Sequence, residues 1–122
     1  MGYYSQVCYR IEGTKDNLDL FVRDLKDRLI KNNYEEDFFN NSFARLIVNE
    51  DYIIIHLPNC KWYDFIDNHF AQIITKIVKE YHFDKELIEY HFIRIGEDLE
   101  DIEEYFTDNV GEYLYIVREI EY

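Results

Sequence analysis

Six side chains of this sequence could ligate a transition metal or act as a base or nucleophile. They are Cys8, Cys60, His56, His69, His82 and His91. Their spacing matches neither a paired-cysteine knuckle nor an HExxH helix, so we expect no metal site. A nucleophilic cysteine needs a neighbouring base and a lowered pKa, whereas the many acids of this chain favour a raised one. We therefore expect buried, unreactive thiols, and a packed, hydrogen-bonded His69 on the apolar side of a helix.

The sequence gives little support to nucleotide binding or to catalysis by a pair of carboxylates. The four glycines, Gly2, Gly13, Gly96 and Gly111, stand singly and form no phosphate-binding loop. Pairs of carboxylates are abundant, but a glycosidase-like pair needs a cleft, and the short connections of this chain leave little to build one. We expect no catalytic residue and no cofactor. A small enzyme with a carboxylate or histidine base stays as an alternative, which a deep pocket lined by His56 or His91 together with acids would support.

A dense acidic run is the most unusual feature of the chain. Six acids fall within eight residues: Glu97, Asp98, Glu100, Asp101, Glu103 and Glu104. As a helix this run would be about 12 Å long, with roughly one negative charge per 2 Å, close to the ~1.7 Å per charge of duplex DNA. We predict that this run, with Tyr105 beside it, is a protein-binding surface that docks on a basic groove made for nucleic acid. The alternative is a solvated face of a short helix that Leu99 and Ile102 hold to the core.

Composition points in the same direction. The 122 residues include 26 acids against 13 lysines and arginines, for a net charge of -13, with 48% hydrophobic and 18% aromatic residues. Such a chain can bury a core as a single domain over 1–122, but its self-repulsion favours a partner with a basic surface. Direct nucleic-acid binding is disfavoured because the cations are scattered among the acids. No apolar run approaches the ~20 residues that span a bilayer, and no signal-like leader opens the chain, so we expect a reduced, cytoplasmic setting.

The hydrophobic pattern predicts the elements that position these residues. Alternation predicts a half-buried strand over 3–12, and apolar spacing predicts a helix capped by Thr14, with Leu18, Phe21, Val22, Leu25 and Leu29 on its stripe. A polar loop, 31–42, leads to a β-hairpin over 43–57, whose second run has little polar alternation and should lie inside a sheet. Pro58 and Asn59 should end that strand. A second helix over 62–81, a strand over 87–95, a short acidic helix over 97–106 and a last strand over 112–122 complete the series.

This order of elements predicts an α+β fold of the ferredoxin-like, split βαβ type (βαββαβ). Right-handed crossovers would place both long helices on one face of an antiparallel sheet. The last strand would then be added at the edge of the sheet beside the fourth strand.

Three short patches resemble a loose group of small uncharacterised phage and prophage proteins. They are Met1-Gly2-Tyr3-Tyr4, Lys61-Trp62-Tyr63-Asp64, and Gly96-Glu97-Asp98 followed by Asp101-Ile102 and Tyr105-Phe106. The resemblance implies a phage accessory protein, and small acidic phage proteins commonly block host machinery, including defence nucleases, by stoichiometric binding.

The function expected from the sequence is therefore a non-catalytic acidic binding protein. It would be a phage-encoded, anti-CRISPR-like inhibitor that mimics nucleic acid and occupies the basic groove of a host nucleic-acid-handling or defence complex in the host cytoplasm. A homo-oligomeric structural or regulatory module, paired through the edge of the last strand, is the second hypothesis.

Overall fold

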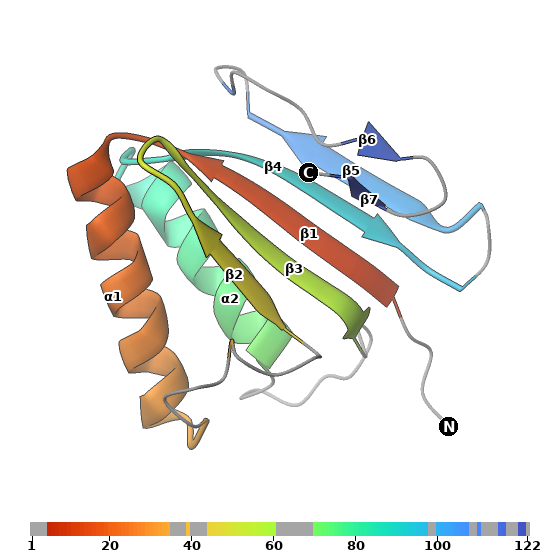
Figure 1. Cartoon of the computed structure of the whole chain (residues 1–122), viewed down its shortest axis with the longest axis horizontal. Helices are drawn as coiled ribbons and strands as arrows, with labels where there is room; N and C mark the ends of the chain where they lie inside the picture. The colour runs from red at the N-terminus through yellow and green to blue at the C-terminus, as the bar shows by residue number, and fades with distance from the viewer. Residues whose placement is uncertain are drawn as a thin grey trace.

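The computed structural model describes residues 5–34, 39, 44–60, 70–97, 100–107, 110, 115–116 and 120–121. These residues form an α+β fold with a five-stranded antiparallel sheet and two helices, which confirms the predicted class (Figure 1). In chain order the elements are β1 (Ser5–Glu12), α1 (Lys15–Lys31), β2 (Arg45–Val48), β3 (Tyr52–Cys60), α2 (Phe70–Lys79), the π-helical turn η2 (Glu80–Asp84), β4 (Glu89–Ile95), β5 (Ile102–Phe106), β6 (Tyr115–Ile116) and β7 (Ile120–Glu121).

The strands of the sheet lie in the order β2-β3-β1-β4-β5. β1 is the central strand, and Tyr9 pairs with Ile55 of β3 on one side and with Phe92 of β4 on the other. The sequence predicted a strand half exposed on one face, but Cys8 on the second face of β1 is fully buried. β1 is therefore covered on both faces, as expected of the strand in the middle of a sheet.

The β2–β3 hairpin is as predicted, with residues 49–51 as its turn and Val48 paired with Ile53. β3, however, continues through Pro58 to Cys60, so the predicted stop at Pro58 is wrong. Pairing with β2 ends at Arg45 and His56, so Pro58 lies beyond the β2 ladder, where its missing N–H costs no ladder bond on that side. The pairing of β3 with β1 also shifts register between Ser5 and Val7.

Local signals set the ends of α1. Thr14 has extended backbone angles and its hydroxyl accepts a hydrogen bond from the Asn17 amide at 3.3 Å, as predicted for its N-cap. At the other end Asn33 has φ 70°, and the amides of Asn33 and Tyr34 donate to the carbonyls of Ile30 and Leu29. This is a Schellman ending, and asparagine tolerates its left-handed residue well.

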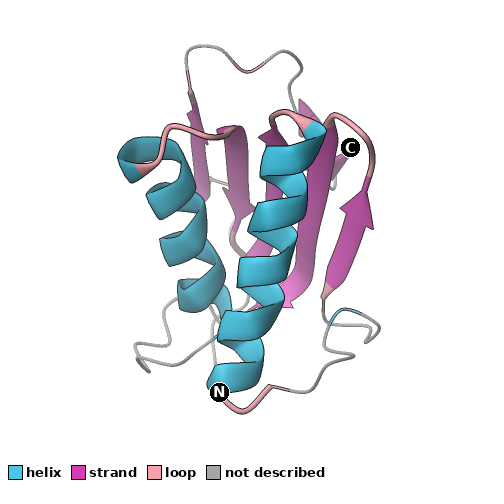
Figure 2. Ribbon diagram, turned by 90° about the vertical axis from the view of Figure 1, so that its left-hand side faces the viewer, coloured by secondary structure: helices cyan, strands magenta, loops and turns pink. Residues whose placement is uncertain are grey.

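Both helices lie on one face of the sheet, and the main core lies between the two layers (Figure 2). The predicted stripe of α1 is confirmed, because Leu18, Phe21, Leu25 and Leu29 are buried. α2 buries Ala71, Ile73, Ile74, Ile77 and Val78. The predicted start of this helix, 62–69, and most of the predicted loop 31–42 lie outside the described residues.

Two predictions for the C-terminal part are wrong. No helix forms over 100–106; Ile102–Phe106 is strand β5, which pairs with β4. β5 therefore holds the edge position beside the fourth strand that was predicted for 112–122. Within that last segment, β6 and β7 pair with each other in a separate two-stranded sheet, and Ile116 faces Ile120.

The face of the sheet opposite the helices has a smaller core. Cys8, Ile54 and Ile93 are buried there, and Tyr52 and Ile95 pack against them. The described part of the chain has no helix long and apolar enough to cross a membrane.

Candidate functional site

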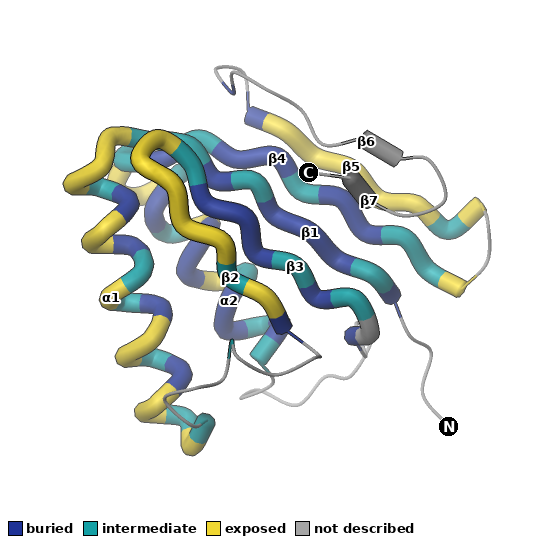
Figure 3. The backbone as a smooth tube through the Cα atoms, viewed as in Figure 1, coloured by how far each residue is buried: buried dark blue, intermediate teal, exposed yellow. Residues whose placement is uncertain are grey.

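Among the strands whose burial the structure describes, β5 is the most exposed, and it carries two acids. All five of its residues are exposed, including the large apolar side chains of Ile102, Tyr105 and Phe106 (Figure 3). Glu103 and Glu104 lie between Ile102 and the pair Tyr105 and Phe106, so one sheet edge carries both acidic and aromatic groups. An edge strand with exposed apolar side chains and unpaired backbone groups is a template for another chain.

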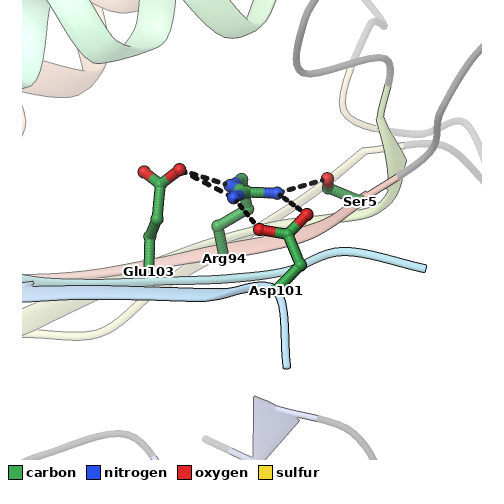
Figure 4. Close-up of polar contacts among 4 residues, drawn as sticks. All are labelled: Ser5, Arg94, Asp101 and Glu103. Atoms are coloured by element: carbon green, nitrogen blue, oxygen red, sulfur yellow. Dashed lines mark hydrogen bonds and ion pairs between the residues drawn. The ribbon is translucent and has the colours of Figure 1, made fainter. Parts of the chain in front are cut away.

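Arg94 of β4 anchors the acids that precede and begin this strand. Its side chain is 1% exposed, and its guanidinium donates from Nη2 to Asp101 Oδ1 and to Glu103 Oε1, each at 2.6 Å. Nη1 donates to Asp101 Oδ2 at 3.1 Å and to Ser5 Oγ at 3.0 Å, and Nε donates to Glu103 Oε1 at 3.1 Å. Figure 4 shows all four side chains on the side of the sheet that carries the helices. Asp101 and Glu103 are thus held in fixed positions.

Two opposing effects act on the charge of Arg94. Burial lowers the pKa of its guanidinium, but hydrogen bonds and charge attraction from Asp101 and Glu103 outweigh burial and raise that pKa overall. Arg94 therefore stays charged at every accessible pH. Its two carboxylates, which are 28% and 48% exposed, keep part of their hydration.

Glu104 has a different partner on the opposite face. Its Oε1 lies 2.8 Å from Nε2 of His91, whose side chain is fully buried, and the His91 ring meets Phe106 edge-on at 5.7 Å. Adjacent residues of a strand point to opposite faces, so Glu103 and Glu104 belong to two separate clusters.

A groove lies beside Glu103, between α2 and strands β4 and β5. It has a volume of about 390 Å³ and is lined by Tyr9, Thr75, Val78, Lys79, Phe83, Tyr90, Phe92, Glu103 and Tyr105. Its origin is geometric: two helices packed ~8–10 Å apart cover about four strands spaced ~4.8 Å, so a fifth strand extends past them. The volume falls in the range of small-ligand sites, roughly 300–1,000 Å³.

The walls of this groove are mainly aromatic. The ring centroids of Tyr9 and Phe92 are 5.0 Å apart, and those of Tyr90 and Tyr105 are 5.5 Å apart. At the floor, the Tyr9 and Thr75 hydroxyls are 2.5 Å apart, and Thr75 also donates to the Ala71 carbonyl at 2.8 Å. Thr75 therefore accepts from Tyr9, which satisfies both hydroxyls within the protein.

Three other residues with hydroxyl or carboxylate groups line the groove: Tyr90, which is buried, and Glu103 and Tyr105, which are exposed. Within the described part of the chain, the Tyr90 and Tyr105 hydroxyls and the Oε2 atom of Glu103 make no hydrogen bond. Burial, and then the neighbouring Tyr105, raise the pKa of Tyr90 to about 12, so its hydroxyl stays a neutral donor. The groove thus offers two phenol groups and one carboxylate oxygen.

The residues of the predicted acidic surface are distributed over two faces and a turn. Asp101 and Glu103 converge on Arg94, Glu104 pairs with His91, and Tyr105 lines the groove. Glu97 and Glu100 are exposed in the turn between β4 and β5, and Asp98 lies outside the described residues. The predicted helical spacing of these charges is wrong because the segment is a turn followed by a strand.

Neither cysteine is placed for chemistry. Cys8 and Cys60 are both reduced and buried, as predicted, and burial raises their thiol pKa values to about 12 and about 11. The sequence attributed such a rise to nearby acids, whereas the structure gives desolvation as its cause.

His82 and His91 make structural contacts in η2 and in the sheet. His82 Nδ1 lies 2.8 Å from the Ile88 carbonyl, and His91 pairs with Glu104. No group of three or more His, Cys, Asp or Glu residues in the described part of the chain could hold a metal ion. His69 lies outside the described residues, and neither His56 nor His91 lines the groove.

Sequence reasoning missed Arg94 and the groove residues Tyr9, Tyr90 and Phe92. One signal was available for Arg94, because strand alternation places it on the same side as Tyr90 and Phe92, where a charge needs a partner. The two partners follow seven and nine residues later in the acidic run. No sequence signal indicated the groove, which depends on the number of strands relative to helices.

Comparisons with protein-family models, with curated proteins and with solved structures found no match to this chain.

Proposed function

We propose that this protein is a non-catalytic acidic binding protein that occupies a basic, nucleic-acid-binding surface of a partner. The observation that carries the proposal is strand β5, which presents exposed acids and exposed aromatic side chains together on one sheet edge. The net charge of -13 supplies the long-range attraction to a basic partner.

The ion pairs of β5 support a binding surface of fixed shape. Arg94 orients Asp101 and Glu103, and His91 orients Glu104, so these carboxylates lose little side-chain freedom when a partner docks. Tyr105 and Phe106 add large contact areas at low entropic cost, as aromatic residues do at interfaces.

The biological setting proposed is a phage accessory protein that acts in the host cytoplasm. The resemblance of three short patches to small phage and prophage proteins supports this setting. In it the partner would be a nuclease or another nucleic-acid-handling or defence complex, inhibited by stoichiometric, anti-CRISPR-like binding.

The architecture proposed is ferredoxin-like over β1, α1, β2, β3, α2 and β4. The strand order β2-β3-β1-β4 and the placement of both helices on one face support it. β5 is then an addition to that unit, and it carries the proposed interface.

The test begins with capture of partners from host lysate at low salt, followed by affinity measurements on the purified complex. Duplex DNA should compete with the protein for the partner. The dissociation constant should rise about tenfold or more between 50 and 300 mM salt because screening weakens electrostatic attraction. An affinity that stays flat over this range, or a complex indifferent to DNA, contradicts the proposal.

A charge-matched pair of variants makes the test specific to β5. The first replaces four acids of this region by amides: Glu100, Asp101, Glu103 and Glu104. The control changes the net charge equally with four exposed acids elsewhere: Asp19, Asp27, Glu50 and Asp51. Only the first variant should lose most of its affinity; an equal loss in both would assign binding to net charge alone.

A second candidate function is self-association through β5. Ile102, Tyr105 and Phe106 are 44%, 44% and 48% exposed on an edge strand, and two copies could pair there in antiparallel fashion. Light scattering after size exclusion at micromolar concentration separates this from the first proposal. A dimer that Ile102→Lys converts to a monomer would favour the second candidate.

A further inference from the structure

We propose that the groove between α2 and strands β4 and β5 binds an arginine side chain of the partner, with the guanidinium between aromatic rings and against Glu103. This inference deepens the proposed function, on which it rests. The groove would supply the specific contact that long-range charge attraction alone lacks.

The shape and lining of the groove suit a planar cation. Five of the residues that line its volume of about 390 Å³ are aromatic: Tyr9, Phe83, Tyr90, Phe92 and Tyr105. Aromatic faces attract cations through the negative potential of the ring, and guanidinium groups also stack on them. An aliphatic arginine stem can pack against Val78 at the α2 wall.

Glu103 favours a cation at the β5 end of the groove. It is the acidic residue in the lining, whereas its neighbour Asp101 and their shared partner Arg94 do not line the groove. Arg94 occupies Oε1 of Glu103, whereas Oε2 has no hydrogen-bond partner in the described part of the chain. A carboxylate held by one guanidinium through one oxygen can accept from a second guanidinium through the other.

Lys79 and Glu103 should affect cation binding in opposite directions. It lines the α2 side of the groove and is exposed, so its ammonium opposes the entry of a cation. Removal of Lys79 should therefore strengthen cation binding, and removal of the Glu103 charge should weaken it. If the groove bound an anion instead, removal of Lys79 would weaken binding and removal of the Glu103 charge would strengthen it.

The test is a titration of the full chain with butylguanidinium chloride and, in parallel, with the uncharged isostere butylurea, followed by backbone amide chemical shifts. Butylguanidinium should move the resonances of Tyr90, Phe92 and Tyr105 and bind at least tenfold more tightly than butylurea. Equal affinity for the two probes, or shifts confined to other strands, would overturn the proposal.

Three variants complete the experiment. Glu103→Gln, which keeps an acceptor for Arg94, should weaken butylguanidinium binding about tenfold, and Lys79→Ala should strengthen it severalfold. Glu50→Gln removes one negative charge from the exposed turn between β2 and β3, outside the groove lining, and should leave probe binding within about twofold. A gain of affinity in Lys79→Ala is a readout that structural damage would not produce.

A peptide distinguishes a protein side chain from a small-molecule cation. Acetyl-Gly-Arg-Gly-amide should shift the same three resonances as butylguanidinium. If the free cation binds and the peptide does not, the groove takes a small molecule and the inference is wrong. These probes need no partner, so a groove that fails to bind them is distinguishable from an acidic surface that fails to capture a basic complex.

Discussion

At the scale of single residues, Arg94 connects the core of the protein to its exposed edge. It is a charged side chain that the fold buries almost completely, and its guanidinium donates to Glu103 of β5, to Asp101 in the turn before β5, and to Ser5 at the start of β1. The same side chain thus joins β4 to the two strands on either side of it.

We predict that Arg94→Met destabilises the protein by about 2 kcal/mol. Loss of one partner of a buried ion pair costs ~3–5 kcal/mol, but Asp101 and Glu103 are partly exposed and regain hydration, which reduces that cost. Urea unfolding followed by tyrosine fluorescence or circular dichroism measures the difference.

A matched control for Arg94 is Lys85→Met. Lys85 is 42% exposed; its ammonium lies 3.9 Å from Asp24 and 4.4 Å from the centre of the Tyr81 ring, so it makes two contacts at the surface. Its removal should change stability by less than about 1 kcal/mol. Equal losses in the two variants would contradict the role assigned to the buried Arg94 cluster.

The two thiols give a prediction that depends on pH. Burial raises the pKa of Cys8 to about 12 and that of Cys60 to about 11, from an ordinary value near 9.0. The folded thiols therefore stay protonated at pH 8 and should react with Ellman's reagent at least a hundredfold more slowly than in 8 M urea, where both should react fully.

The same shifts affect stability in alkali. A raised folded-state pKa gives a stabilisation that is fully present below pH 9 and is lost as pH rises through the range between 9 and 12, because the unfolded thiols ionise first. A Cys8→Ala, Cys60→Ala variant should show a smaller alkaline loss of stability. Rapid labelling of the native protein at pH 8 would contradict the burial of these thiols.

At the scale of elements, the helices and turns that depend on neighbouring residues could be predicted from the sequence. Thr14, the apolar stripe of α1 and the turn at 49–51 each specify a structure within one short window, and all three are confirmed. The ferredoxin-like arrangement of these elements stays a prediction.

The segment over 100–106 was predicted as a helix because its own residues fit both a helix and a strand, and contacts with another strand decide between the two. Leu99, Ile102 and Phe106 fit a helical spacing, but Ile102, Glu104 and Phe106 fit a strand equally well. Cross-strand pairing decides between them: β5 places Glu103 opposite Arg94 and Ile102 opposite Ile95. Arg94 and its two partners lie only seven and nine residues apart, but this spacing alone does not show that they pair across two strands, and the groove depends on elements distant in the sequence. Neither β5 nor the groove was therefore predicted.

The N-cap of α1 offers a quantitative check at this scale. Thr14→Ala should cost about 1 kcal/mol because it leaves an amide of the first turn without its acceptor. Thr14→Asp should keep most of that stability, since aspartate caps equally well and favours the positive end of the helix. Thermal unfolding compares the three proteins, and an equal loss in both variants would contradict the assigned cap.

At the scale of the whole molecule, the charge of -13 sets the response to salt. Like charges repel within the folded protein, and salt screens this repulsion over about 10 Å at 0.1 M. We predict that the urea midpoint rises between 0.02 and 0.3 M sodium chloride, while binding to a basic partner weakens over the same range. A control variant with the four acids Asp19, Asp27, Glu50 and Asp51 replaced by amides should show a smaller rise in its midpoint.

The two edges of the sheet also bear on solubility. β2 exposes Ile47 and Val48, and β5 exposes Ile102 and Phe106, so both edge strands of the five-stranded sheet present apolar side chains. At neutral pH, mutual repulsion keeps such edges apart, and Glu103 and Glu104 act as gatekeepers within β5. Near the isoelectric point of about 4.6 that protection disappears, and the molecules should stack edge to edge and precipitate, so purification and storage belong well above this pH.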